Sequence, residues 1–162
     1  MLTAGTLFLL SCSSGGGMSA TAKKNKEVNS AIMKAYETGD FSKMSEYIAA
    51  DAVDHGGEKG DVKGLENIVS EMKRYKSMVT DMKSTIIREM ADDEYVMTWA
   101  TMSAKMNGTE MSMSSVDVSR FKDGKAVEHW VFMNPMDMMK MMPQPVPGMD
   151  ESANPPADST KK

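Results

Sequence analysis

Two short turns in the second half of the chain constrain its fold more than any other feature. Asn107-Gly108 and Asp123-Gly124 each stand between segments rich in alternating apolar and polar residues. Such dipeptides are the strongest short-range signals for a two-residue β-hairpin. With the break "ADD" at 91–93, they divide residues 81–134 into four strands. The pattern therefore predicts an antiparallel meander of four strands.

The region before the meander has helical periodicity. Apolar residues recur at helical spacing within residues 28–36, 41–48 and 65–75, which predicts three helices. Residues 52–64 hold too many glycines for a helix and predict an extended segment with a loop. Three helices followed by four strands make an α+β domain, with the helices packed on an antiparallel sheet.

The two turns also fix the strand register if no bulge intervenes. Asp117 then falls opposite Trp130 on one side and opposite Thr98 on the other. Since cross-strand partners share a face, one face of the sheet gathers a carboxylate among methionine and aromatic side chains. Its members are Thr98, Met102, Met113, Ser115, Asp117, Trp130 and Phe132. His129 is expected on the opposite face, so an Asp117–His129 pair is disfavoured, and Asp54 is expected to point away from His55.

Size and charge narrow the classes of function. A chain of 162 residues allows one domain with a buried core. Its net charge of -4 provides no electrostatic footprint for nucleic acid. Metal-ligand motifs, a nucleophile elbow and a glycine-rich phosphate loop are all missing from the sequence. We therefore expect no nucleic-acid partner, no metal and no cofactor.

The two ends of the chain differ from its middle. The apolar segment "LTAGTLFLL" at residues 2–10 leads to "SCSSGGG", which contains the only cysteine, Cys12. This resembles the lipobox of bacterial lipoproteins, which implies that Cys12 carries the lipid and that residues 1–24 are signal and tether. The domain would then face the periplasm or exterior from the bacterial cell envelope, held to the membrane by the lipid anchor only. The alternative is a disordered tail with an isolated cysteine.

The C-terminal residues 143–162 are rich in proline and predict a disordered tail. That leaves residues 25–142 for the folded domain.

Two motifs in this domain point to a family. "DAVDHG" at residues 51–56 lies between the second and third predicted helices, and "VDVSRFKDGKAVEHWVF" ends the meander. Together they resemble the SnoaL-like polyketide cyclases of the nuclear transport factor 2-like superfamily, over nearly all of residues 25–135. The resemblance implies a cone-shaped fold in which a curved sheet wraps around the helices and leaves a mostly apolar pocket. It also implies that the chain can form a homodimer through the sheet.

The same resemblance suggests roles for individual residues. Asp117 looks like the counterpart of the family's general acid/base aspartate, and His55 matches a position that often faces the pocket. The ligand implied is small and apolar or carbonyl-containing. Burial in an apolar pocket would raise the pKa of such a carboxyl toward the working pH. The residues expected to contact the ligand are Trp130, Thr98, Met102, Met113 and Phe132.

Each assignment has a structural alternative. In this alternative Asp117 hydrogen-bonds Thr98 or a backbone amide at a bulge, or faces solvent. His55 then only binds a loop carbonyl, and Trp130 belongs to the core. A non-catalytic ligand- or protein-binding module therefore stays open, because folds of this kind host several functions.

The methionine content suggests a third candidate function. The chain has 20 methionines, and several cluster at its end: Met133, Met136, Met138, Met139, Met141 and Met142. Thioethers select Cu(I), so the cluster is consistent with a copper-binding protein. The simpler interpretation is that methionine replaces leucine as a flexible core residue and that this segment forms a short helix closing the cone.

Overall fold

The computed structural model describes residues 17–57 and 59–141, apart from the side chains of Met138, Lys140 and Met141. The predictions for the signal segment and its Cys12, for Met142 and for the C-terminal tail at 143–162 lie outside the described residues.

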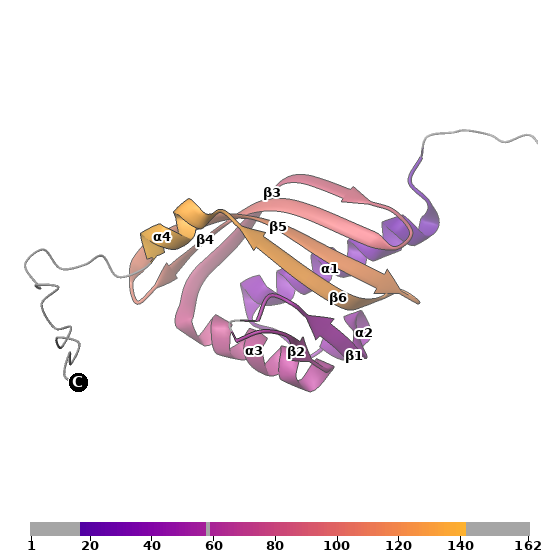
Figure 1. The fold of residues 1–162 in the computed structure, drawn as a ribbon, viewed down its shortest axis with the longest axis horizontal. Coiled ribbons are helices and arrows are strands. Elements are labelled where there is room, and N and C mark those ends of the chain that lie inside the picture. The colour runs from indigo at the N-terminus through magenta and orange to yellow at the C-terminus, as the bar shows by residue number, and fades with distance from the viewer. Residues whose placement is uncertain (1–16, 58, 142–162) are drawn as a thin grey trace, which may run out of the picture.

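Four helices and six strands make up this part of the chain (Figure 1). In chain order they are α1 (Ala20–Thr38), α2 (Met44–Tyr47), β1 (Ile48–Asp54), β2 (Val62–Lys63), α3 (Leu65–Met78), β3 (Val79–Ala91), β4 (Tyr95–Met106), β5 (Thr109–Lys122), β6 (Lys125–Met133) and α4 (Pro135–Met141).

Only one long helix stands at the N-terminus, so the prediction of three N-terminal helices is wrong. α1 begins after Ser19, whose hydroxyl caps the helix by accepting from the Ala22 amide at 3.0 Å, and ends at Gly39 with φ 78°. α2 is a single turn because Ile48 already pairs with β6 as the first residue of β1. α3 follows β2 rather than preceding the sheet.

The six strands form one sheet in the order β2-β1-β6-β5-β4-β3. The predicted meander is confirmed as β3 to β6, all paired antiparallel. The sheet as a whole is mixed, because β1 runs parallel to β6. The prediction of a purely antiparallel sheet is therefore wrong at this one pairing, which covers an edge of β6 that would otherwise be unpaired.

The predicted hairpin turns are both present. Asn107 and Gly108 have φ angles of 50° and 79°, and Asp123 and Gly124 have 51° and 75°. Positive φ at both central residues is the signature of a type I′ turn, whose twist matches that of the strands it joins. The predicted β4–β5 register is confirmed, with Thr98 opposite Asp117.

The β5–β6 register contains a bulge that the sequence analysis left out. Phe121 pairs with Ala126 but Arg120 pairs with Glu128, so Val127 is an extra residue in β6. Beyond Val127, every residue of β6 moves by one position and changes face. Asp117 consequently lies opposite Val131 rather than Trp130.

The helices α1 and α3 pack on one face of the curved sheet, here called the inner face (Figure 1). The main core lies between them and the sheet and consists of Val28, Ala35, Phe41, Met44, Ile48, Ala52, Ile68, Met72, Val96, Phe121 and Ala126. Met82 and Met113 are also buried. Four methionines, at positions 44, 72, 82 and 113, are thus core residues.

Candidate active site

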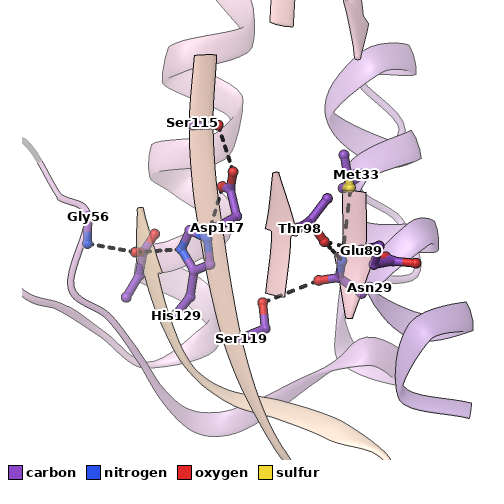
Figure 2. A network of polar contacts seen from close by, with 10 residues as sticks. Asn29, Met33, Gly56, Glu89, Thr98, Ser115, Asp117, Ser119 and His129 are labelled. Carbon is purple, nitrogen blue, oxygen red and sulfur yellow. Dashed lines mark hydrogen bonds and ion pairs between the residues drawn. The ribbon is translucent and has the colours of Figure 1, made fainter. Parts of the chain in front are cut away.

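His129 occupies the centre of a polar cluster on the inner face (Figure 2). Its Nδ1 lies 3.0 Å from Oδ1 of Asp54, the last residue of the parallel neighbour β1. Its Nε2 lies 3.4 Å from Oδ1 of Asp117 on the antiparallel neighbour β5. The three side chains therefore come from three adjacent strands, and we call them the Asp-His-Asp trio.

Each carboxylate of the trio has a second contact that orients it. Oδ1 of Asp54 accepts the Gly56 amide at 2.8 Å, and Oδ2 of Asp117 accepts the Ser115 hydroxyl at 2.7 Å. A Cβ on Gly56 would lie 2.7 Å from Cγ1 of Val131. Only glycine lets the backbone pass this close to β6 and donate to Asp54.

The contacts determine the charge state of His129. Burial alone would lower its pKa, but the hydrogen bonds to Asp117 and Asp54, together with the charges of both carboxylates, raise the pKa to about 9. The ring is therefore an imidazolium at neutral pH, and both of its nitrogens carry protons that they donate to the flanking carboxylates.

The same interactions fix the charge of Asp54. Burial would raise the pKa of its carboxyl, but the hydrogen bond and charge of His129 and the Gly56 amide outweigh burial and hold the pKa below its usual value. Asp54 is therefore a carboxylate at neutral pH. Its Oδ2 has no hydrogen-bond partner among residues 17–57 and 59–141.

A cavity of about 70 Å³ lies beside the trio, between α1, α3, β1, β5 and β6. We call it the inner cavity. It is lined by Ile32, Tyr36, Ile48, Ala52, Val53, Asp54, Ile68, Met72, Ser119, Ala126, Glu128 and His129. Most of these side chains are apolar. The volume is enough for about five water molecules or a ligand of that size, much smaller than the several hundred Å³ that drug-sized ligands occupy.

Tyr36 brings a hydroxyl to this cavity. Its ring is held edge-on to Phe41 and Tyr75, at centroid distances of 5.9 and 6.4 Å. Burial, and after it the negative charges of Asp54 and Asp117, raise the pKa of the phenol. Tyr36 therefore stays neutral, and no hydrogen bond to its hydroxyl is found within the described part of the chain.

A second polar network lies deeper on the inner face (Figure 2). Asn29 of α1 donates to the Thr98 hydroxyl at 3.0 Å and accepts from the Ser119 hydroxyl at 3.2 Å. Thr98 in turn donates to Glu89 at 3.3 Å, and Glu89 pairs with Lys26 at 2.9 Å. Because Thr98 is 1 % exposed and its hydroxyl is fully engaged, its role here is structural.

The structure does not bring the two predicted catalytic residues together. Asp117 lies on the inner face, whereas the ring of His55 stacks on Trp130 at a centroid distance of 4.8 Å and its Nδ1 lies 3.0 Å from Asp61. Asp54 and His55 do point apart, as predicted. The prediction that His129 and Asp117 lie on opposite faces is wrong, because the bulge at Val127 turns His129 inward.

The bulge also displaces the predicted ligand-binding residues. Trp130 and Phe132 pair with Val118 and Val116 on the face opposite the trio, here called the outer face, and Phe132 is 60 % exposed. Met102 packs against a second core cluster with Val79, and Met113 is buried. Neither these four nor Thr98 is among the residues lining the inner cavity.

Sequence reasoning missed Asp54, Tyr36 and His129 as site residues. One signal could have identified the bulged register: it places Arg120 opposite Glu128, and the two form an ion pair with 2.5 Å between Nε and Oε2. Without the bulge Arg120 would face Val127. Cross-strand pairs of opposite charge stabilise a register, so this pair favours the bulge.

The Met-rich end of the chain forms α4. Met136 and Met139, three residues apart on this helix, are 61 % and 54 % exposed. Copper binding there stays a prediction. Within the described residues, no group of three or more His, Cys, Asp or Glu side chains is arranged to hold a metal ion, and none of the helices described is both long and apolar enough to cross a bilayer.

A curved sheet with helices packed on its inner face, and a mostly apolar cavity between them, is typical of the nuclear transport factor 2-like class of fold. A family model of the SnoaL-like domain matches residues 30–129, and the chain belongs to this family. No protein of the curated set matches the chain.

Solved structures agree on the fold. A candidate SnoaL-like polyketide cyclase from Jannaschia sp. CCS1 aligns with a TM-score of 0.67 and 13% identity, over 80% of this chain and 99% of the other. An epoxide hydrolase of M. tuberculosis, described as LEH-like, aligns with a TM-score of 0.65 and 18% identity, over 74% of this chain and 89% of the other. IdmH from Streptomyces antibioticus, a candidate polyketide cyclase, aligns with a TM-score of 0.60 and 23% identity, over 72% of this chain and 96% of the other. At these identities the likeness concerns the fold alone.

Proposed function

We propose that the domain binds a small, largely apolar ligand in the inner cavity and that the Asp-His-Asp trio performs acid/base chemistry on it. The observation that carries the proposal is the ring of His129, held between the carboxyl groups of Asp54 and Asp117 at the wall of a mostly apolar cavity. Buried charged groups are costly unless they are paired, and such clusters are more frequent at functional sites than elsewhere.

Asp54 is the proton acceptor in this proposal. It lines the cavity as a carboxylate, and Oδ2 is the oxygen that no described residue engages. His129 is a positioning residue, since it holds Oδ1 of Asp54 and keeps the carboxylate ionised. Asp117 holds the other side of the ring, so that His129 keeps its orientation when Asp54 takes up a proton.

For a carbonyl-containing ligand, the reaction is removal of a proton from the carbon next to the carbonyl. Asp54 takes this proton, and the neutral hydroxyl of Tyr36 donates to the carbonyl oxygen as negative charge develops there. The C–H bonding electrons move into the enolate, and the proton returns from Asp54 to carbon or oxygen. The size of the cavity favours ligands of about five non-hydrogen atoms.

Exchange of the α-protons of butanone in D₂O tests this chemistry, followed by NMR with and without the protein. We expect exchange that Asp54→Asn abolishes and that Asp51→Asn, an exposed site on the same strand, leaves intact. Binding without exchange would favour a non-catalytic module. If neither exchange nor binding occurs with any small apolar ligand, the proposal is refuted.

We also propose that a second copy of the chain covers the outer face. Its exposed apolar side chains lie on β3, β4 and β6: Met90 at 57 %, Met97 at 39 %, Trp99 at 49 % and Phe132 at 60 % exposure. Several large apolar side chains exposed on one sheet face are unusual on a monomer, and a sheet face can pair with the same face of a second copy about a two-fold axis.

Anchoring to the cell envelope through a lipid on Cys12 is proposed from the sequence alone, since Cys12 lies outside the described residues. The support is the apolar run before Cys12 and the serines and glycines after it. Membrane fractionation of the expressed chain tests the anchor. Cys12→Ser should release the protein from the membrane fraction, and unchanged association would rule out acylation at this residue.

A further inference from the structure

The hydrogen-bonding groups at the inner cavity are mostly acceptors. Five residues with polar side chains line it: Tyr36, Asp54, Ser119, Glu128 and His129. The imidazolium of His129 has two N–H groups, and both are directed to carboxylates of the trio. The hydroxyl proton of Ser119 goes to Oδ1 of Asn29. Neither residue therefore has a proton left to offer a ligand.

The two carboxylates among the lining residues, Asp54 and Glu128, differ in the hydrogen-bond acceptors that they leave for a ligand. Oε2 of Glu128 is paired with Nε of Arg120, and its Oε1 lies 3.8 Å from Nε2 of His55, whose ring stacks on Trp130 of the outer face. Asp54 keeps Oδ2 without a partner among the residues described. The remaining polar group, the hydroxyl of Tyr36, can donate one hydrogen bond and can also accept. A ligand in the cavity thus meets one charged acceptor, one hydroxyl and a single available donor.

The charge of the wall agrees with this inventory. The charged residues that line the cavity are Asp54, Glu128 and His129, and no lysine or arginine is among them. Arg120 balances Glu128, and His129 is shared between Asp54 and Asp117. The single positive charge of His129 is therefore shared between two carboxylates, and the negative charge of Asp54 is only partly balanced. An anionic ligand would be repelled, whereas a cation would complete the pairing.

We propose that the preferred ligand of the inner cavity is a small organic amine, bound as its ammonium ion, with the ammonium on Oδ2 of Asp54 and the alkyl group among the apolar side chains. This rests on the proposed function only in that the same cavity binds a small ligand. An amine held on Oδ2 would compete with a carbonyl compound for Asp54. An ammonium offers three donors to a wall of acceptors, and its hydrogen bond to a carboxylate is charge-assisted. The face of the Tyr36 ring is also attractive to a cation.

Four ligands of similar size and shape provide the test: isobutylamine, isobutanol, butanone and isobutyrate. Their affinities are measured by NMR titration of the ¹⁵N-labelled protein at neutral pH, with Ala52 and Ser119 as reporters at the cavity wall. We expect isobutylamine to bind at least about tenfold more tightly than isobutanol, the ratio of a charge-assisted to a neutral hydrogen bond. Isobutyrate should not bind.

Two variants assign the preference to residues. Asp54→Asn should remove the preference for the amine and leave isobutanol binding within about threefold of the wild type. Asp51→Asn is the matched control for surface charge, and it should change nothing. Tyr36→Phe should weaken butanone, which needs the donor, more than isobutylamine.

The outcomes separate this inference from the proposed function. If isobutanol or butanone binds as tightly as isobutylamine, the amine preference is overturned while the cavity remains a ligand site. Tighter binding of isobutyrate would also overturn it. If none of the four ligands shifts the cavity reporters, both the inference and the proposed function fail. Should Asp54→Asn not fold, the wild-type series alone decides.

Discussion

Nε2 of His129 lies 3.4 Å from Oδ1 of Asp117, on the inner face of the sheet, because β6 contains one extra residue at Val127. On the other side of the ring, Asp54 arrives from the parallel strand β1. His129 is thereby enclosed by two carboxylates beside an apolar cavity. The charge of this ring makes the stability of the domain depend on pH above neutrality.

Stability should fall as the pH rises above neutrality. A histidine in the unfolded chain titrates near 6.5, and contacts with both carboxylates raise the pKa of His129 in the folded state to about 9. A raised folded-state pKa contributes stability that is complete below the unfolded value and is lost on passing through the folded value. The free energy of unfolding from urea titrations should therefore decrease between about pH 6.5 and about pH 9.

His129→Gln should lack this decrease, and His55→Gln is the control because His55 is the chain's other histidine. An equal slope in wild type and His129→Gln would contradict the assignment. At acid pH the sign reverses for Asp54. Its lowered pKa contributes stability that is present above the ordinary pKa of about 3.8 and is lost as the pH falls through the folded value.

Asn29→Ala should destabilise the domain by about 1–3 kcal/mol, because it leaves the buried hydroxyls of Thr98 and Ser119 without their partner. Ser30→Ala, at an exposed position on the same helix, should change the free energy of unfolding little. Urea titration compares the two variants. Equal stability of both would mean that the buried network does not stabilise the fold.

Gly56→Ala should disturb the trio. The new Cβ would lie 2.7 Å from Cγ1 of Val131 and 3.2 Å from Oδ1 of Asp54, so the loop must move away from β6. We expect a loss of about 1–3 kcal/mol and a lower pKa for His129, since Asp54 moves with the loop. Gly17→Ala, which has open space around it, is the control. An unchanged pKa would show that Gly56 does not position Asp54.

Phe132→Lys should keep the protein monomeric. Phe132 is exposed on the outer face, and a lysine there would place a charge within the proposed dimer contact. Light scattering after size-exclusion chromatography measures the mass. Ser70→Lys, on α3, adds the same charge away from the outer face. If wild type and both variants have the same mass, the outer face is not a dimer contact.

The local parts of the fold could be predicted from the sequence, and the non-local parts could not. Asn107-Gly108 and Asp123-Gly124 determine their turns through backbone preferences of adjacent residues, and the β4–β5 register follows from the first of them. The bulge at Val127 changes register without any turn residue to mark it, and only the Arg120–Glu128 pair reveals it.

The site depends most on pairings between distant parts of the chain. Asp54 reaches His129 because β1 runs parallel to β6, and parallel strands have no turn between them to reveal the register. Asp117 could be predicted as a site residue because it is a lone carboxylate among apolar strand residues. Tyr36 lies in the expected apolar stripe of α1, where nothing in the sequence separates a core tyrosine from one that lines a cavity.

The pKa and protonation state of His129 test the central claim most directly. Both quantities follow from the ¹⁵N and ¹H shifts of the histidine rings in a pH titration of the folded chain, with His129→Gln to assign the signals. We predict a pKa of about 9, with protons on both ring nitrogens at neutral pH. A neutral ring at neutral pH, with a pKa at or below the ordinary 6.5, would mean that the two carboxylates do not hold an imidazolium, and the proposed site would be wrong.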